Sequence, residues 1–327
     1  MNCTDNQFGY QNIIFCIPVY NDWEAAAVLI ERLDHEIAML DNRVSLLIVD
    51  DGSTEGAPAK FSKALSKIDK IEIIHLRRNL GHQRAIAMGL AYIHANHECQ
   101  AVLIMDGDGE DDPGDVKTLI ERCSKWSFRK IIFARRSKRR DGIVFRMGYI
   151  SYKIVHYLLT GIRVEVGNFS IIPYHLLKRL MGVSEIWNHY AAAVFHAKLP
   201  LEKVPIPRGE RILGRSKMNL ISLVVHGMSA ISVFGETVAV RVLCLVSLLM
   251  LLTLAGLAAT VSIKFFTDFA IPGWATNLTG ILFIVLLNLL LLAIFSVLMM
   301  LNSRDRLSFL PVRDWQYFID DKRTIYG

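Results

Sequence analysis

The sequence predicts an α/β head with a mostly parallel sheet, followed by a C-terminal hairpin of two transmembrane helices. Short apolar runs rich in branched residues alternate with helix-patterned segments through the first 210 residues. Acidic turns follow several of these runs. Farther along the chain, the uncharged apolar stretches 242–263 and 278–301 each have about the 20 residues that a bilayer-spanning helix needs.

The expected elements of the head follow each other in a regular order. Strands are predicted at 13–19, 44–49, 71–76, 101–105 and 130–134, and helices at 22–40, 60–68, 81–95 and 142–160. Asp112-Pro113 is typical of a helix cap followed by proline at the first helical position. Because strands alternate with helices, the sheet should be largely parallel and covered on both faces. Ligands of such sheets bind outside the carboxyl ends of the strands.

The second half of the chain leads from the head to the hairpin. Residues 204–207, with two prolines, cannot be helical. Residues 218–234 are apolar but interrupted by polar side chains, which fits either a helix lying on the membrane surface or an amphipathic helix packed on the head. The expected domains are a catalytic head (1–210), a basic loop with this helix (211–237), two transmembrane helices (238–303) and a tail (304–327).

Charge predicts how the hairpin is oriented. The two outer flanks are rich in lysine and arginine, whereas the connector 264–273 holds one Lys and one Asp. The positive-inside rule then places the head and the tail in the cytoplasm. The polar N-terminal segment has no apolar signal core, so export of the head is not expected.

Composition narrows the class of partner. The net charge is +6, and a basic belt beside a membrane anchor favours anionic lipid or a phosphorylated substrate. No nucleic-acid-binding pattern accompanies this belt, so nucleic acid is not an expected partner. The five cysteines are scattered and form no CxxC pair, which argues against a zinc site or a disulfide framework.

An acidic motif follows the predicted strand 101–105. Asp106 and Asp108 are two residues apart, so in an extended chain they project to the same side. Hard divalent cations prefer oxygen ligands, and Mg²⁺ or Mn²⁺ commonly bridges carboxylates to a diphosphate. Glu110 is a possible third ligand. The alternative is an acidic, solvated turn before a helix.

Two further turns carry polar groups suited to a nucleotide. Asp50 and Asp51 end the second predicted strand, where a carboxylate can accept hydrogen bonds from a base or a ribose. Tyr20 and Asp22 follow the first strand, where Tyr20 could stack on a base and Asp22 bind it. Each turn alone also fits a simple structural role, including a helix N-terminus capped by Asn21 or Asp22.

Taken together and in this order, the motifs resemble the family 2 glycosyltransferases with the GT-A fold. The family pattern P-x-Y-N-E, V-D-D-G-S-x-D, R-N-x-G and M-D-A-D-x-Q-D-P-P corresponds here to 18–22, 49–55, 78–81 and 105–113. Gly107 stands where the branch usually has Ala, and Glu110 where it has Gln. The R-x-x-G-x-S-K motif of the polyprenyl-phosphate branch, which includes dolichyl-phosphate mannose synthases, is matched at 211–217. The paired C-terminal spans also resemble that branch.

The resemblance implies a role for each matched position. Nucleotide-sugar-binding residues would be Pro18, Tyr20, Asp22, Asp50, Asp51, Arg78 and Asp106. Asp106, Asp108 and Glu110 would hold Mg²⁺ or Mn²⁺, and the catalytic set would be Asp106, Asp108, Arg211 and Lys217, with the last two approaching the diphosphate. Arg135, Arg146 and Ser151 fall near positions that grip the acceptor phosphate.

The implied activity is an inverting transfer of a sugar from a nucleotide diphosphate sugar to polyprenyl phosphate, at the cytoplasmic face of a bacterial inner membrane. Homo-oligomers and a flippase that carries the product are possible partners. Asn168 stands where many members have an aspartate that is a candidate base. A phosphate acceptor needs no base because its second pKa is near 6. The rival hypotheses are transfer to a saccharide or other hydroxyl, and a non-catalytic nucleotide-sugar-binding scaffold for a flippase.

Overall fold

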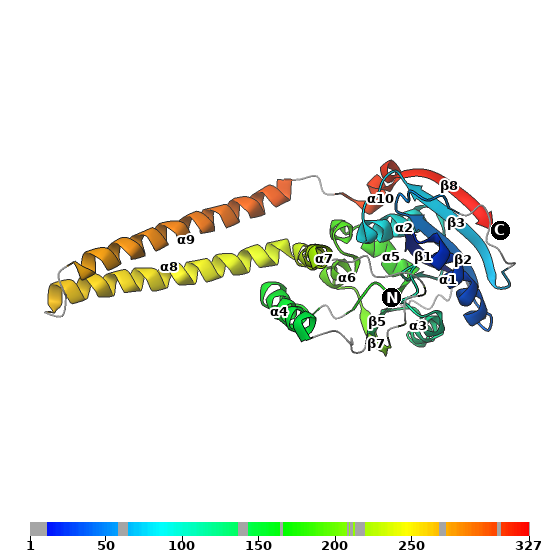
Figure 1. Ribbon diagram of the computed structural model, residues 1–327, viewed down its shortest axis with the longest axis horizontal. Helices are drawn as coiled ribbons and strands as arrows, with labels where there is room; N and C mark the ends of the chain where they lie inside the picture. Colours follow the sequence, from blue (N-terminus) through cyan, green and yellow to red (C-terminus); the bar gives the residue numbers. More distant parts are fainter. Residues whose placement is uncertain are drawn as a thin grey trace, which may run out of the picture. The chain divides into compact units, whose positions relative to one another are not determined.

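The computed structural model describes residues 12–57, 65–136, 143–163, 166–207, 209, 212, 220–267, 273–305 and 309–326. The chain divides into two compact units (Figure 1). The first, here called the head, comprises Met1–Tyr149, Arg163–Val233 and Ser308–Gly327. The second comprises Ile150–Ile162 and Phe234–Leu307. The chain therefore leaves the head twice and returns to it each time, the second time with its C-terminal segment.

One mixed sheet organises the head. Its strands are β1 (Asn12–Val19), β2 (Arg43–Asp50), β3 (Ile68–Leu76), β4 (Ala101–Ile104), β5 (Ile131–Arg136), β6 (Ser170–Pro173), β7 (Leu201–Ile206) and β8 (Ile319–Tyr326). Their order in the sheet is β7-β5-β6-β4-β1-β2-β3-β8. The pairs β4-β1, β1-β2, β2-β3 and β5-β7 are parallel, whereas β6 and β8 run antiparallel to their neighbours.

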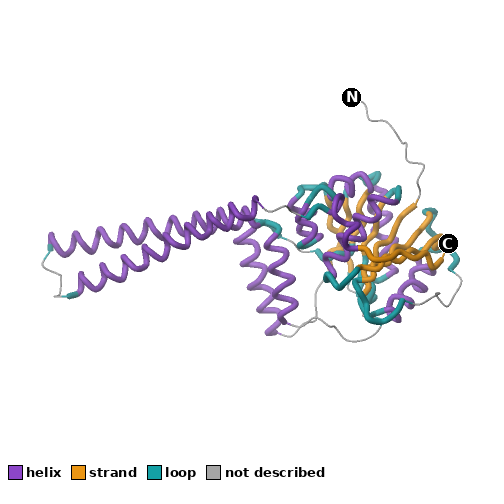
Figure 2. Tube along the Cα trace, turned by 90° about the horizontal axis from the view of Figure 1, so that it is seen from above, coloured by secondary structure: helices purple, strands orange, loops and turns teal. Residues whose placement is uncertain are grey.

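Helices cover both faces of this sheet (Figure 2). On β1, Cys16 packs with the helices α2 (His82–Asn96), α5 (Tyr174–Leu180) and α6 (Tyr190–His196). Phe15 points to the opposite face, where α1 (Trp23–Glu36) and α3 (Val116–Lys125) complete a second core. Since neighbouring strand residues project to opposite faces, burial on both sides explains why the central strands are continuously apolar.

The structure confirms the five predicted strands and the first, third and fourth predicted helices, the last of them as α4 (Ile143–Thr160). Asp112 caps the short helix η1 (Pro113–Asp115) by accepting a hydrogen bond from the N–H of Gly114 at 2.9 Å. The predicted helix at 60–68 lies partly outside the described residues, and its described end is wrong. Residues 65–67 are not helical, and Ile68 begins β3.

The C-terminal segment was predicted only as a tail, yet it completes the sheet. After α10 (Pro311–Asp314) and η3 (Trp315–Phe318), β8 pairs antiparallel with β3 and covers what would be an open edge. Phe309 and Phe318 pack against Trp187 of η2 (Ser184–Trp187), with ring centroids 4.1 and 5.1 Å away. Aromatic packing and strand pairing therefore both hold this segment to the head.

In the second unit, α8 (Gly235–Phe266) and α9 (Trp274–Asp305) lie side by side (Figures 1 and 2). Both are long and apolar enough to cross a membrane. Arg241 of α8 donates hydrogen bonds to the carbonyl oxygens of Tyr157 and Leu158, at 3.3 and 2.7 Å, near the end of α4. A cation at this end of a helix satisfies unpaired carbonyls and complements the helix dipole.

Candidate active site

Three motif-bearing turns meet at one edge of the sheet. β1 lies between β2 and β4, and both pairs are parallel. The N–H of Asp51 donates to the carbonyl of Val19 at 2.9 Å, and the N–H of Met105 donates to that of Cys16 at 3.3 Å. The turns after β1, β2 and β4 are therefore neighbours, at the edge where parallel sheets bind ligands.

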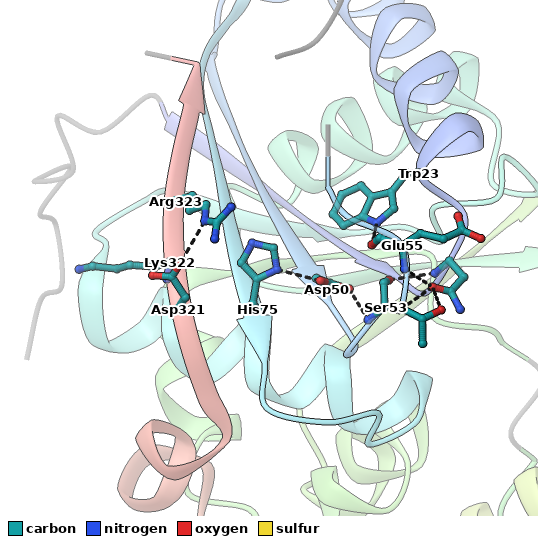
Figure 3. Close-up of polar contacts among 10 residues, drawn as sticks. Trp23, Asp50, Ser53, Glu55, His75, Asp321, Lys322 and Arg323 are labelled. Atoms are coloured by element: carbon teal, nitrogen blue, oxygen red, sulfur yellow. Dashed lines mark hydrogen bonds and ion pairs between the residues drawn. The ribbon is translucent and has the colours of Figure 1, made fainter. Parts of the chain in front are cut away.

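The turn after β1 is tied to the turn after β2. Asn21 has a left-handed backbone, with φ of 48°, and its side-chain oxygen accepts the N–H groups of Thr54 and Glu55 at 2.8 and 3.3 Å. Trp23 donates its indole N–H to the carbonyl of Glu55 at 3.2 Å (Figure 3). These bonds hold Tyr20, which is 40% exposed, beside the joined turns. Tyr20 is thus accessible to a flat ligand such as a base.

Asp50 is buried and bonded within the protein. Its carboxylate accepts the N–H of Ser53 at 2.9 Å and pairs with Nδ1 of His75 at 2.8 Å (Figure 3). Across the sheet, His75 lies in register with Asp321 of β8. The returning C-terminal strand therefore flanks the residue that holds Asp50 in place.

Asp51 is buried as well, and both of its oxygens accept backbone N–H groups. Leu80 donates to one at 2.7 Å and Gly81 to the other at 2.9 Å, just before α2 begins. Burial raises the pKa of Asp51, and the two N–H donors offset only part of this shift. Asp50 and Asp51 thus fix the loops of the site. Among the expected nucleotide ligands, Arg78 is exposed and Asp22 partly exposed.

Gly52 allows the loops that carry the second and third motifs to pack closely together. Its φ is +68°, and a Cβ there would lie 2.6 Å from backbone atoms of both Arg78 and Asn79. Only glycine accepts this conformation without strain and leaves room for the neighbouring loop. The loop that carries Arg78 is therefore packed directly on the turn after β2.

The acidic motif after β4 lies at the same edge. Asp106 and Asp108 are partly exposed; the N–H of Asp106 donates to Asp111 at 2.9 Å, and Asp108 accepts the N–H of Glu110 at 3.0 Å. Within the described residues, no three His, Cys, Asp or Glu side chains are grouped as a complete metal site. The oxygen donors suit Mg²⁺ or Mn²⁺, which often takes one or two carboxylates and completes its coordination with phosphate and water.

Gly209, just before the basic motif, and Ile212, its second residue, lie on this acidic turn. The N–H groups of Gly209 and Ile212 donate to the carbonyls of Glu110 and Asp108, at 3.2 and 3.1 Å. Gly109, with φ of +81°, leaves the space that Ile212 fills, since a Cβ there would lie 2.3 Å from the Ile212 side chain. Arg211 and residues 213–219, which include Lys217, lie outside the described residues.

A chain of amide hydrogen bonds, here called the amide relay, runs from Tyr190 through Gln83 to Asn168, which lies beside His82. The backbone N–H of Tyr190 can only donate, so it fixes Oε1 of Gln83 as its acceptor at 2.8 Å. Nε2 of Gln83 then donates to Oδ1 of Asn168 at 3.0 Å, and Nδ2 of Asn168 faces Nε2 of His82 at 2.8 Å. His82 lies 3.1 Å from the carboxylate of Asp106. Asn168 is therefore a fixed hydrogen-bonding group.

His82 lies beside the acidic turn. Burial lowers its pKa, yet attraction and hydrogen bonding by Asp106, with smaller contributions from Asp108 and Asp111, outweigh that effect, so the pKa of His82 is raised. A negative potential is therefore concentrated around the acidic turn. Such a potential favours a divalent cation.

Two histidine rings also pack together in the head. His226 of α7 (Leu220–Ser232) lies 4.7 Å from His189, measured between ring centroids. Burial lowers the pKa of His226, as does repulsion from His82. Residues far apart in sequence make up this pair, and no spacing pattern could have revealed it.

The expected acceptor residues are divided between the two units, with Arg135 in the head and Ser151 in the second unit. Arg135 is exposed at the end of β5, in register with Pro205 of β7. The side chain of Arg146 is outside the described residues, and Ser151 is exposed on the part of α4 that belongs to the second unit.

These features match those of a known family. The model of Glycosyl transferase family 2 matches residues 14–180, just over half of the chain, including the three strand-end turns. The chain belongs to glycosyl transferase family 2. It is therefore a glycosyltransferase.

Named relatives agree with this assignment. An uncharacterised glycosyltransferase of Bacillus subtilis, YkcC, is 26% identical over 80% of both chains. The undecaprenyl-phosphate 4-deoxy-4-formamido-L-arabinose transferase of Klebsiella pneumoniae is 24% identical over 73% of this chain and 76% of its own. The dodecaprenyl-phosphate galacturonate synthase of Rhizobium johnstonii is 25% identical over 54% of this chain and 52% of its own.

Solved structures share the fold. Glucosyl-3-phosphoglycerate synthase from Mycobacterium tuberculosis, crystallised with Mn²⁺, UDP-glucose and phosphoglyceric acid, superimposes with a TM-score of 0.50 at 14% identity, over 70% of this chain and 80% of its own. The mostly parallel mixed sheet is that of the GT-A fold, as the sequence predicts.

The amide relay predicts energetic coupling between Gln83 and Asn168. Gln83→Ala and Asn168→Ala each break their shared bond, so the double variant should be more stable than the sum of the single losses implies, by roughly 0.5–3 kcal/mol. Urea unfolding of the detergent-solubilised protein measures this. As a control, Gln83→Ala should combine additively with Asn42→Ala, which breaks a remote amide pair with Gln100. Additive losses for Gln83 and Asn168 would contradict the relay.

Proposed function

We propose that this protein is an inverting glycosyltransferase that moves a sugar from a nucleotide diphosphate sugar to polyprenyl phosphate. The observation that carries the proposal is the joining, in one chain, of a family 2 head with an acidic strand-end site and a helical pair able to cross a membrane. Transfer from a soluble donor to a lipid acceptor requires both the head and the helical pair. Relatives named for undecaprenyl-phosphate and dodecaprenyl-phosphate products support the acceptor class.

On the donor side, Tyr20 would stack on the base, Asp22 and Arg78 would bind the nucleotide, and Pro18, Asp50 and Asp51 would shape its loops. Asp106 and Asp108, with Glu110 beside them, would hold Mg²⁺ or Mn²⁺. A bound cation would supply charge neutralisation to the departing nucleoside diphosphate. Arg211 and Lys217, on the segment that starts against the acidic turn, would add positive charge there.

On the acceptor side, the neutral Asn168 is compatible with a phosphate nucleophile. Its amide is bonded to Gln83 and faces His82, and it cannot accept a proton as an aspartate would. A phosphate monoester is largely ionised at neutral pH, so its oxygen can attack the anomeric carbon without a base. Arg135, Arg146 and Ser151 would contact this phosphate.

The hairpin and the domain boundaries complete the proposal. The head (1–210) would work in the cytoplasm, followed by the basic loop and α7 (211–237), two spans (238–303) and the tail (304–327), in a bacterial inner membrane. Since β8 pairs with β3, the chain must cross the membrane an even number of times between them. Val224, Val225 and Met228 of α7 are exposed, which favours contact of α7 with lipid. A flippase would then carry the product across.

Loss of the acidic pair should abolish turnover. Asp108→Asn keeps the size of the side chain but removes its charge, so we expect at least about a 100-fold fall in sugar transfer and weaker Mn²⁺ binding. Activity with polyprenyl phosphate and electron paramagnetic resonance of bound Mn²⁺ measure the two effects. Asp112→Asn, which alters an exposed helix cap, is the matched control. Full turnover in Asp108→Asn, or turnover in strong chelator, would show that no metal acts here.

The acceptor hypothesis predicts a pH dependence. Below its second pKa, near 6, the phosphate takes up a proton and becomes a poorer nucleophile, so transfer should fall about tenfold between pH 7 and pH 5. The product is read by mass spectrometry, with nucleotide binding and thermal unfolding at both pH values as controls. The wild-type Asn168 enzyme should be active without Asp at this position. Glycosylation of a free polyprenol or a sugar hydroxyl, with polyprenyl phosphate ignored, would refute the phosphate acceptor.

The orientation is tested by labelling intact cells. In a background lacking Cys3 and Cys244, Thr267→Cys, at the end of α8, should react with a membrane-impermeant maleimide added outside. Ser303→Cys, near the end of α9, should react only after the membrane is opened. The reverse pattern would place the head outside.

A further inference from the structure

A polar amide lies near the middle of the second apolar helix. Asn288 is about 15 Å along the helix axis from Leu278 and about 20 Å from Leu301, the two ends of the apolar stretch, at 1.5 Å per residue. The hydrocarbon core of a bilayer is about 30 Å thick. If α9 crosses the membrane, Asn288 is therefore close to the midplane, where no water is at hand to solvate it.

The helix itself satisfies only part of this amide. Nδ2 of Asn288 donates to the carbonyl of Ile284 at 2.9 Å, which leaves a second N–H and the side-chain oxygen. The hydroxyls of Thr253, Thr260 and Ser296 also donate to the carbonyl four residues earlier, at 2.8 Å in each case. A hydroxyl has a single hydrogen and is satisfied as a donor in this way, whereas the amide is not.

Asn288 lies away from the other helix of the pair. The residues of α9 that are least exposed recur at helical spacing, at Leu282, Leu286, Leu289 and Ala293, and Leu282 approaches Gly256 of α8. At about 100° per residue, Asn288 is roughly 120° around the helix from this stripe. Asn288 is itself exposed. On the same face, Ile284, one turn before it, is 59% exposed, and Phe295, two turns after it, is 60% exposed.

We propose that the Asn288 face of α9 packs against the same face of a second copy of this chain. A twofold axis along the membrane normal places identical residues at equal depth, so the two Asn288 side chains meet. Each carboxamide then donates its remaining N–H to the oxygen of the other. Polar side chains of this kind associate helices in membranes because lipid offers them no partner. The proposal rests on α9 spanning the membrane and does not depend on the reaction catalysed.

The chemistry of the amide favours this occupant. A lipid acyl or prenyl chain has no group to hydrogen-bond at this depth, and a phosphate headgroup lies at the membrane surface. An amide is both donor and acceptor, so it is complementary to itself. The flanking exposed residues, including Ile281 and Ile284, supply apolar contact on either side of the pair.

Disulfide crosslinking of the purified full-length protein in lipid vesicles tests the proposal. In the background lacking Cys3 and Cys244, Ile284→Cys lies one turn from Asn288 on the same face, whereas Leu252→Cys is an exposed position near mid-depth on α8. Mild oxidation should give a dimer with Ile284→Cys, at a yield at least fivefold above that with Leu252→Cys. Adding Asn288→Leu should reduce the dimer at least fivefold, and adding Ser296→Ala should leave it unchanged.

Counting subunits by single-molecule photobleaching provides a second measurement without cysteine geometry. The labelled wild-type protein should bleach mainly in two or more steps at low density in vesicles, and Asn288→Leu mainly in one. Wild-type protein that bleaches in one step, or an Ile284→Cys crosslink that persists with Asn288→Leu, overturns the proposal. Because no nucleotide sugar is used, this result is independent of the assays for the proposed reaction.

Discussion

Parallel pairing of β1 with β2 and β4 is the constraint on which the site depends. It brings the turns after these strands to one edge, although their residues are separated by up to 90 positions in the sequence. The continuous burial of these strands on both faces specifies their place at the centre of the sheet. Without that burial, the turns would be three unrelated polar loops.

Polar groups in the head divide into those that build the loops and those that stay partly exposed at the edge of the sheet. The side-chain oxygens of Asp50, Asp51 and Asn21 accept hydrogen bonds from backbone N–H groups of nearby loops. The bonds of Asp50 and Asp51 satisfy carboxylates that burial would otherwise penalise. Asp106 and Asp108 remain partly exposed. The rigid frame thus carries the charge that a cation or a diphosphate would meet, and little reorganisation is needed on binding.

The closing strand links the two halves of the chain. β8 follows the apolar helical pair, yet it pairs with β3, and Asp321 lies in register with His75, which holds Asp50. Trp315 and Phe318 of η3 also pack on the core, and both α10 and η3 contact α2. The two ends of the helical pair therefore both return to the head, which restricts how the pair can enter a bilayer.

The α/β head, five of its strands, the apolar helical pair and the three strand-end turns could all be predicted from the sequence. These follow from local patterns: branched apolar runs, helical spacing and acidic residues directly after strands. The long-range contacts show in addition that Asp50 and Asp51 hold loops, that Gln83 and Asn168 are joined by an amide hydrogen bond beside His82, and that 319–326 is a strand. The relay joins residues up to 107 positions apart, and β8 has an exposed polar surface. Both depend on long-range hydrogen bonds that leave no period or motif in the chain.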